Sequence, residues 1–259
     1  MNITLNKNAR LFLSYVLPSM VGMLIVGSYS IVDTIFIGQA AGELGLASVA
    51  VTWPLVMLFW AVGDMLGTGG AIIISQSRGN GNLAQARLIF GNMLCFQVVF
   101  SFAMLGVINY FLTDALLLLG ADKELLPGAV RYSRIIIYGN LACMLMTAVS
   151  SVIRNDGRPV LSMWLTVGGL LLNILLDYIF IFPLKGGIAG AAYATVVSQA
   201  LMAIAGLFYF ATGYTKLRYA WSMFKIRLSN LMKIVISGIP SLGNQLSVIA
   251  MLFSIIIRL

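Results

Sequence analysis

Three aspartates lie within long apolar stretches of this 259-residue sequence, at positions 33, 64 and 177. An aspartate at the centre of a membrane helix costs about 2.5 to 3.5 kcal/mol on insertion scales, and such residues are usually retained for function. A carboxylate in that setting takes up a proton or attracts a cation. The chemistry to consider first is therefore the binding of protons or cations.

Two of these aspartates are expected at one depth with other oxygen-bearing side chains. Asp33 and Asp177 each lie about five residues, or roughly 7 to 8 Å, from the outer end of an apolar stretch. Asn173 precedes Asp177 by one helical turn and shares its face, and Thr195 is expected at a similar depth in the next stretch. Oxygen ligands suit a hard cation such as Na⁺ as well as a proton. We predict a cation-coupling site of Asp33, Asn173, Asp177 and Thr195, which would also be the metal site if the ion is Na⁺.

Tyr29 and Asp64 are candidates for binding an organic cation together with Asp33. Tyr29 precedes Asp33 by four residues on the same face, where an aromatic ring beside a carboxylate attracts such cations. Asp64 is expected at a different level, in the segment GDMLGTGGA. Close helix packing through its glycines and a second protonatable group on the substrate path both remain open for that segment. Most other aromatic residues, Trp53 and Trp60 among them, are expected to face lipid or the membrane interface.

The composition excludes a water-soluble protein and several kinds of chemistry. The sequence is 60% hydrophobic and 9% charged, whereas soluble domains carry about a quarter charged residues. It has no histidine, and Cys95 and Cys143 both lie in apolar runs, so zinc, haem and disulfide frameworks are not expected. The net charge of +8 resides mainly in short loops, which indicates membrane orientation rather than nucleic-acid binding. No cofactor is expected beyond a coupling ion, Na⁺ or H⁺.

The elements that must position these residues are membrane helices. Apolar runs predict an all-α polytopic membrane protein, with helices at about 11–38, 46–75, 88–110, 133–153, 160–182, 188–211 and 232–257. Basic residues concentrate in alternate loops, and that set is assigned to the cytoplasm with the N-terminus. It comprises Lys7, Arg10, Arg78, Arg87, Arg154, Arg158, Lys216, Arg218, Lys225, Arg227 and Lys233. We therefore expect a multi-pass protein of the cytoplasmic (inner) membrane, in contact with membrane lipid.

An internal repeat is indicated by the pairs Pro18-Ser19 and Pro240-Ser241, each early in an apolar helix. The predicted organisation is a six-helix lobe at 1–212, a basic cytoplasmic linker at 213–230, and the first helix of a second lobe at 231–259. We expect the chain to be part of a longer protein whose second lobe is its partner. The RNDGRP segment at 154–159 and the glycine-rich segment at 77–82 are read as cytoplasmic turns, because neither has the order of a phosphate-binding loop.

Three segments resemble the multidrug and toxic compound extrusion family of exporters, in its bacterial branch and its amino-terminal part. They are LPSMVGMLIVGSYSIVDTIFIGQ at 17–39, NILLDYIFIF at 173–182 and GIAGAAYATVVSQ at 187–199. The resemblance implies two six-helix lobes and export of cationic, amphipathic drugs and toxic compounds, driven by inward Na⁺ or H⁺ flow. It also implies that Asp33, Asn173, Asp177 and Thr195 form a cation site.

The resemblance further implies that helix one bends at Pro18 when the ion binds, near Tyr29. Two departures concern the ligand shell. Tyr178 follows Asp177 where family members often have proline, and Thr147 stands where they often have asparagine.

Other functions remain as alternatives. A flippase for lipid-linked oligosaccharides, built on a related fold, would line its cavity with Lys and Arg to hold pyrophosphate. A non-transporting membrane scaffold or sensor would show no ion-dependent ligand binding. An enzyme is not expected, because no nucleophile, base and orienting group occur together at one depth.

Overall fold

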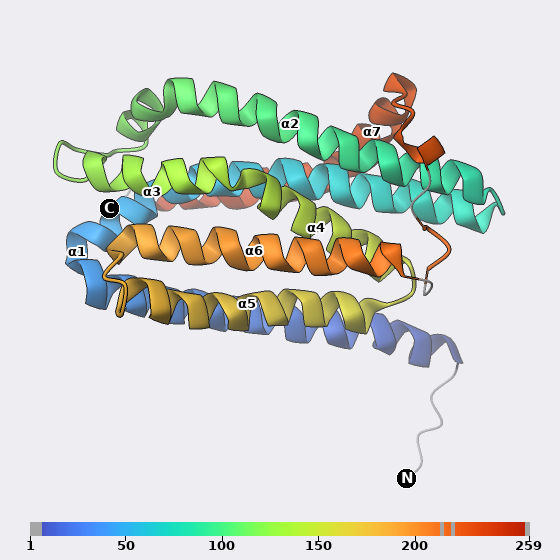
Figure 1. Ribbon diagram of the computed structural model, residues 1–259, viewed down its shortest axis with the longest axis horizontal. Coiled ribbons are helices and arrows are strands. Elements are labelled where there is room, and N and C mark those ends of the chain that lie inside the picture. Colours follow the sequence, from blue (N-terminus) through green and yellow to red (C-terminus); the bar gives the residue numbers. More distant parts are fainter. Residues whose placement is uncertain (1–6, 213–214, 219–220, 257–259) are drawn as a thin grey trace, which may run out of the picture.

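The apolar runs form a bundle of long helices, and no strand occurs in the residues that the structure describes. The computed structural model describes residues 7–212, 215–218 and 221–256. Figure 1 shows its elements, which are α1 (Lys7–Gly79), α2 (Leu83–Leu118), α3 (Leu126–Tyr138), α4 (Asn140–Asn155), α5 (Pro159–Ile181), α6 (Gly187–Ala211), a 3₁₀ helix (Trp221–Phe224) and α7 (Leu228–Ile256). The predicted all-α fold is confirmed.

The outer surface of the bundle is apolar, as a lipid-facing surface must be. Large apolar side chains such as Phe102, Leu118 and Phe208 are 63%, 88% and 69% exposed. Five of the described helices are long and apolar enough to cross a membrane, and the bent pair of α3 and α4 makes a sixth such segment. Helices satisfy their own backbone hydrogen bonds, so these segments are stable in hydrocarbon. The chain is a multi-pass membrane protein.

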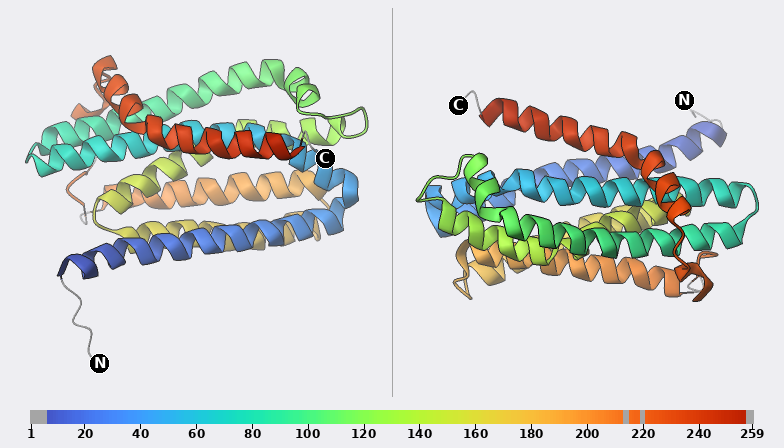
Figure 2. Two further views of the ribbon diagram at one scale, coloured as in Figure 1. Left: turned by 180° about the vertical axis from the view of Figure 1, so that it is seen from behind. Right: turned by 90° about the horizontal axis from the view of Figure 1, so that it is seen from above.

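The helix α1 contains two of the predicted helices, because the chain reverses within it at Gly42 (Figures 1 and 2). Gly42 has φ 62° and ψ −162°, a backbone conformation that residues with a Cβ rarely adopt. The first arm (residues 7–41) and the second arm (residues 43–79) are helical up to this residue. The loop expected between 38 and 46 is therefore wrong in extent, since only Gly42 leaves the helical conformation.

The predicted helix at 133–153 is also corrected, because it is the bent pair α3 and α4. The two helices meet at an angle of 51°. The side chain of Asn140 donates a hydrogen bond to the carbonyl oxygen of Ile137 at 2.9 Å, and Ser101 on α2 bonds to the same side chain. A side chain that bonds to the backbone ladder in this way accounts for a kink. A Cβ at Gly139 would lie only 2.3 Å from Val196 on α6, so the bend also brings α6 close.

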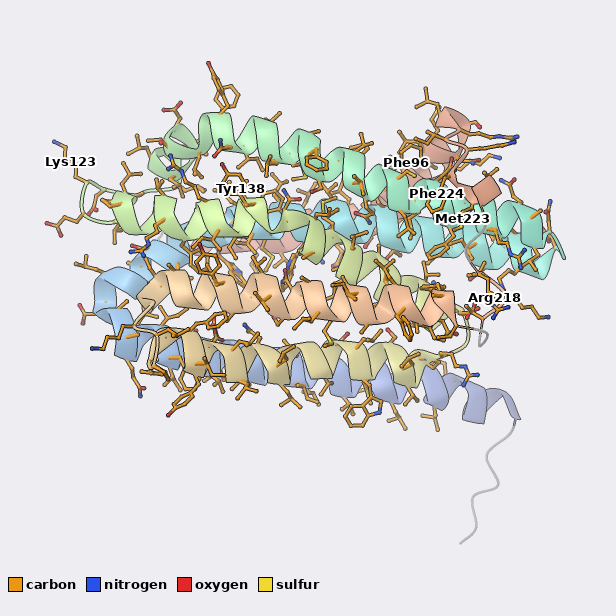
Figure 3. All side chains as sticks on the ribbon, viewed as in Figure 1. Phe96, Lys123, Tyr138, Arg218, Met223 and Phe224 are labelled. Atoms are coloured by element: carbon orange, nitrogen blue, oxygen red, sulfur yellow. The ribbon has the colours of Figure 1, made fainter. Side chains whose placement is uncertain are left out.

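The segment before α7 is fastened to α2 by Asn92. Its amide nitrogen donates to the carbonyl oxygens of Met223 and Lys225, at 3.2 and 2.9 Å. Its amide oxygen accepts from the backbone of Arg227 at 2.8 Å and from the side chain of Asn230 at 3.2 Å. Figure 3 shows Met223 beside α2. The predicted linker is thus docked in its second half, and α7 begins at Leu228, inside the range expected for the linker.

Helix α7 packs against the second arm of α1 at backbone distance. A Cβ at Gly69 would lie 2.0 Å from the carbonyl oxygen of Ile234, and one at Gly238 would lie 2.0 Å from that of Met65. Small residues permit such approach in membrane helices, where close packing replaces the hydrophobic effect as the source of association. Glycine is therefore required at both positions.

Basic residues mark one end of the bundle. Figure 3 places Arg218 at one end and Lys123 at the other. The turns at the Arg218 end, called the basic end below, also hold Arg78, Arg158 and Lys216. Two clusters of buried apolar side chains fill the bundle: one surrounds Phe90, Met144 and Phe210, and the other surrounds Phe59, Leu116 and Ile137.

Candidate functional site

A cavity of about 280 Å³ lies among the helices of the bundle. Its wall is mainly apolar and aromatic, with polar groups at intervals, which is the usual composition of a small-molecule site. The side chains that line it come from both arms of α1 and from α3, α4, α5 and α6. They include Asp33, Trp53, Val56, Trp60, Asp64, Tyr132, Cys143, Met146, Thr147, Ser150, Ser151, Arg154, Thr166, Leu170, Asn173, Thr195, Ser198 and Gln199.

Two carboxylates from different helices meet beside this cavity. Asp33 is on the first arm of α1 and Asp177 is on α5, which runs along that arm in Figure 1 and in the left view of Figure 2. The two side chains are close enough to interact directly. Asp177 is 0% exposed, whereas Asp33 reaches the cavity. The structure therefore brings together two residues separated by more than half of the sequence.

Several buried polar atoms of this pair and of Asn173 have no hydrogen bond to a described residue. Asp33 Oδ1, both carboxylate oxygens of Asp177 and Asn173 Nδ2 are buried without a hydrogen bond to any residue that the structure describes. A buried charge without a partner is costly, so these oxygens are suited to a proton or a bound cation. A half-turn of the Asn173 amide presents its oxygen instead of its nitrogen. The carboxylate oxygens of Asp33 and Asp177 and the amide oxygen of Asn173 are ligands of the kind that Na⁺ prefers.

Asn173, Thr195 and Tyr132 complete the surroundings of the pair. Asn173 is 3% exposed and lies one turn before Asp177, as its spacing predicted. Thr195 lines the cavity and donates its hydroxyl hydrogen to the carbonyl oxygen of Ala191 at 3.1 Å, which leaves the hydroxyl oxygen free to accept or ligate. Tyr132 on α3 is buried near both aspartates. It was missed because α3 was expected to begin only at residue 133.

Asp64 reaches the same cavity from the second arm of α1. Its carboxylate accepts hydrogen bonds from Thr68, at 3.0 Å, and from Ser241 on α7. The glycines beside it pack closely as well: a Cβ at Gly67 would lie 2.6 Å from Ala148. This segment therefore packs closely against a neighbouring helix and also places Asp64 on the cavity.

Aromatic residues of the cavity correct one expectation. Trp53 and Trp60 were expected to face lipid or the interface, but both line the cavity. Their rings meet edge to face with centroids 6.1 Å apart. The two positions are about two helical turns apart, and Asp64 follows Trp60 by about one more, so all three share a face of the second arm. Their helical spacing relative to Asp64 was the sequence signal that could have identified this face.

Two residues of the predicted sites, Pro18 and Tyr29, are not tested by the described part of the structure. The first arm of α1 is helical through positions 18 and 29. The side chains of Pro18 and Tyr29 lie outside the described residues, so their predicted roles in bending and in substrate binding stay predictions.

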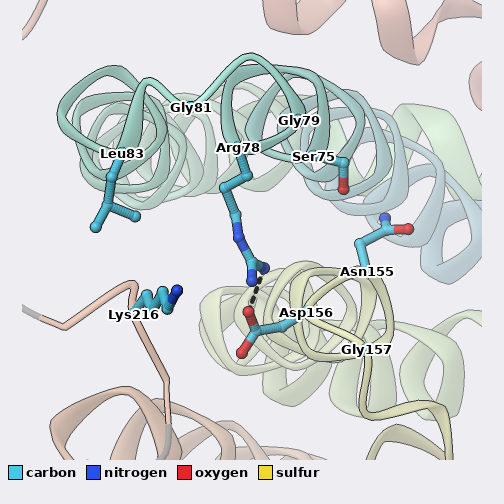
Figure 4. A pocket seen from close by; sticks show the side chains of 9 residues that line it. All are labelled: Ser75, Arg78, Gly79, Gly81, Leu83, Asn155, Asp156, Gly157 and Lys216. Atoms are coloured by element: carbon cyan, nitrogen blue, oxygen red, sulfur yellow. Dashed lines mark hydrogen bonds and ion pairs between the residues drawn. The ribbon is translucent and has the colours of Figure 1, made fainter.

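A second, open pocket of about 600 Å³ lies at the basic end (Figure 4). Arg78 and Asp156 form an ion pair there, and the Tyr209 hydroxyl donates to Asp156 at 2.6 Å. These bonds join the end of α1, the turn after α4 and the end of α6. Gly157 has φ 84°, as a tight turn requires. The RNDGRP segment is thus a turn as expected, except that Arg154 also lines the cavity.

Known proteins share both this sequence pattern and this fold. The MatE family model matches residues 18–179. The probable multidrug resistance protein YpnP of Bacillus subtilis (strain 168) is 30% identical over 196 residues, which cover 74% of this chain and 43% of that protein. The multidrug export protein MepA of Staphylococcus haemolyticus (strain JCSC1435) is 26% identical over 226 residues, covering 87% of this chain and 50% of that protein.

Solved structures agree with these matches. The MATE multidrug transporter DinF-BH, determined in complex with a ligand, is 34% identical with a TM-score of 0.88, over 95% of this chain and 55% of that one. A MATE family transporter of the MOP superfamily in its outward-facing conformation gives a TM-score of 0.86 at 26% identity, over 94% and 54% of the two chains. This chain spans about half the length of the curated relatives that it matches. From the family match and the shared fold, the chain belongs to the MatE family.

Proposed function

We propose that this chain forms one lobe of an ion-coupled antiporter that exports amphipathic organic cations across the cytoplasmic membrane. The observation that carries the proposal is the pair Asp33 and Asp177, in which Asp33 Oδ1 and both carboxylate oxygens of Asp177 are buried without a hydrogen bond to any described residue. Unpaired carboxylates in an apolar surrounding are stable only when a proton or cation joins them. The coupling ion is Na⁺ or H⁺, bound with Asn173 and Thr195.

The cavity beside this pair suits the proposed cargo. Trp53 and Trp60 offer aromatic faces, and Asp33 and Asp64 offer negative charge. Aromatic rings and carboxylates together attract organic cations more strongly than either does alone. The relatives described as multidrug export proteins, and the solved multidrug transporter of the same fold, support the export of drugs.

Coupling follows from the electrostatics of the pair. Two carboxylates at close range repel each other in a medium of low dielectric constant, and an ion that binds between them removes that repulsion. A ligand shifts a conformational equilibrium only through its different affinity for the two states. We propose that ion binding favours the state in which the first arm of α1 bends at Pro18, where the missing backbone N–H weakens the helix. The cavity then contracts, and the cargo leaves on the outer side.

A second lobe is part of the proposal. Helix α7 packs on the second arm of α1, and Ser241 reaches the cavity residue Asp64. Further helices that follow α7 in a longer polypeptide would face the same cavity. The complete transport path would then lie between two lobes, with the basic end of this one in the cytoplasm.

The flippase alternative is less favoured by the lining of the cavity. A pyrophosphate site needs several Lys or Arg side chains. Among the described residues that line the cavity, Arg154 is the one basic residue, against the acidic Asp33 and Asp64. Cationic cargo fits this balance better.

Transport assays test the coupling role. This lobe is joined to the carboxy-terminal lobe of a relative, and dye efflux is followed in membrane vesicles under an imposed Na⁺ or pH gradient. Asp33→Asn and Asp177→Asn are each expected to reduce gradient-driven efflux at least about tenfold, because the ion loses its charged ligand. Asp114→Asn, which changes an exposed carboxylate on α2 outside the cavity, should stay within about twofold of the parent. Efflux by both site variants at the parental rate would refute the coupling role.

A further inference from the structure

A third pocket, of about 400 Å³, lies on the outer surface of the bundle between α3 and α6. It is separate from the cavity and from the basic end, and we call it the α3–α6 groove. It is lined by Pro127, Val130, Arg131, Arg134, Ile135, Ala189 and Tyr193. Among the described residues, two arginines and a tyrosine thus line this groove and no carboxylate does.

Both arginines lie on the face of α3 that points away from the bundle. Residues such as Tyr132 and Ile136 on the inner face are buried, whereas Arg131 and Arg134 are exposed. Neither arginine forms a salt bridge or a hydrogen bond with any residue that the structure describes. A charged side chain on the outer face of a membrane helix is costly unless it reaches water or an anion. These two side chains therefore call for an anionic partner from outside the chain.

The depth of the groove corresponds to the lipid headgroups. Arg131 and Arg134 lie five and eight residues after the start of α3, which is about 8 and 12 Å along the helix. The turn before α3 holds the exposed Lys123, on the water side of that helix end. Arginine side chains extend from such depths toward the headgroups. Tyr193 lies six residues into α6, at a similar depth, and tyrosine is enriched in this layer.

The width of the groove is fixed by close helix contacts at its two ends. A Cβ at Gly128 would lie 3.2 Å from Ile188, and one at Gly139 would lie 2.3 Å from Val196. The lining residues of α3 and α6 lie between these contacts in sequence, and the small side chain of Ala189 leaves room there. The groove is thus formed by the packing of α3 on α6.

The groove lies on the opposite side of the bundle from α7. Among the described elements α7 contacts α1 and α2, and it contacts neither α3 nor α6. The right view of Figure 2 shows α6 and α7 on opposite sides. Helices that follow α7 in a longer polypeptide would start from that other side and leave the groove open to lipid. A second copy in the groove would bring its own arginines close to these, which is unfavourable.

We propose that Arg131, Arg134 and Tyr193 bind one anionic glycerophospholipid from the leaflet at the Lys123 end. The two guanidinium groups hold the phosphodiester, because their planar N–H forks match its oxygens. The Tyr193 hydroxyl donates to the same group, and the apolar part of the lining contacts the glycerol and the first acyl carbons. A headgroup with net negative charge is preferred to phosphatidylethanolamine, whose ammonium group meets two arginines and no carboxylate.

Native mass spectrometry of the purified 259-residue chain tests this site. Protein in detergent is titrated with phosphatidylglycerol or with phosphatidylethanolamine of the same acyl chains, and the fraction carrying one lipid gives each affinity. The parent should bind phosphatidylglycerol at least about fivefold more tightly. Arg131→Gln combined with Arg134→Gln should weaken phosphatidylglycerol binding at least about fivefold and change phosphatidylethanolamine binding by less than about twofold. Lysine at both positions should recover part of the loss, because it restores the charge without the planar fork.

The matched control is Lys123→Gln combined with Lys185→Gln, which removes two exposed positive charges outside the groove, in the turns before α3 and α6. It should change phosphatidylglycerol binding by less than about twofold. An equal loss in both double variants would reveal general charge attraction and refute the site, as would unchanged binding in the double arginine variant. Displacement of the lipid by an equal concentration of inorganic phosphate would assign the arginines to a soluble anion instead. A dimer without lipid, lost in the double arginine variant, would assign the groove to a second copy and overturn the proposal.

Discussion

Asp64 and Asp156 each accept hydrogen bonds from two different helices, whereas the buried oxygens of Asp33 and Asp177 accept none from the described residues. All four are carboxylates in or near a membrane, so the difference lies in what surrounds them. A satisfied carboxylate fastens helices together. An unsatisfied one is available to an ion from outside the chain, which is why the pair is the proposed coupling site.

Gly69 provides a prediction at the level of one residue. The single carbon added by Gly69→Ala would lie 2.0 Å from the backbone of α7, which cannot yield as a side chain can. We expect the melting temperature of the purified protein to fall by about 3 to 10 °C, from an overpacking cost of about 1 to 3 kcal/mol. Gly106→Ala on α2 is the control, because nothing lies within 4 Å of the added carbon. An equal shift in both variants would contradict the close contact.

At the scale of the elements, the segment that joins α6 to α7 is held in place by α2. Three hydrogen bonds connect it to Asn92 and a fourth connects Asn92 to Asn230 in the first turn of α7, and a Cβ at Gly91 would lie 2.2 Å from the carbonyl oxygen of Met223. The start of α7 is therefore held by α2. Close packing at Gly238 and the hydrogen bond from Ser241 to Asp64 hold the following turns of α7 against α1 as well.

Removing this attachment has a measurable effect. Asn92→Ala leaves the carbonyl oxygens of Met223 and Lys225 without the amide that now binds them, so the segment opens more often. Limited trypsin digestion should cut after Lys225 and Arg227 at least about fivefold faster, since cleavage follows the population of the open form. Asn80→Ala, in the exposed turn before α2, should not change the rate. Unchanged cleavage in Asn92→Ala would show that the segment is held in another way.

Features that depend on residues within one helix could be predicted from the sequence, whereas contacts between distant helices could not. Apolar runs and the four-residue spacing of Asn173 and Asp177 lie within single helices, so periodicity revealed them. Asn92 was not identified, because its partners are more than 130 residues away and its span looked uniformly apolar. Arg154 looked like an orientation signal, since its position beside the cavity depends on where α4 ends relative to α5 and α6. The kink at Gly139 likewise depends on neighbouring helices.

For the whole molecule, the charge distribution predicts how the bundle lies in the membrane. Arg78, Arg158 and Lys216 gather at one end and Lys123 lies at the other, and such bias orients membrane proteins. The family's fold and the apolar surface make the bundle a membrane protein without fixing which end is inside. The orientation is a separate prediction.

Thiol labelling determines the orientation. Lys216→Cys and Lys123→Cys place a thiol at opposite ends of the bundle, on exposed residues, while Cys95 and Cys143 lie within it. A membrane-impermeant maleimide added to intact spheroplasts should label Lys123→Cys and should reach Lys216→Cys only after permeabilisation. The parent chain reports any reaction of its own cysteines. The reverse pattern of labelling would invert the assigned topology, and with it the direction of transport.

The reversal at Gly42 also limits how the length of this chain can change during evolution. Both arms are helical up to that residue, so no loop lies between Asp33 and the turn to absorb an added or lost position. Each residue advances an α-helix by about 100°, so a one-residue deletion between 33 and 42 would swing Asp33 away from Asp177. Substitutions there change one side chain, whereas a deletion moves the whole ion site. We expect family members that keep this site to align through the segment without gaps.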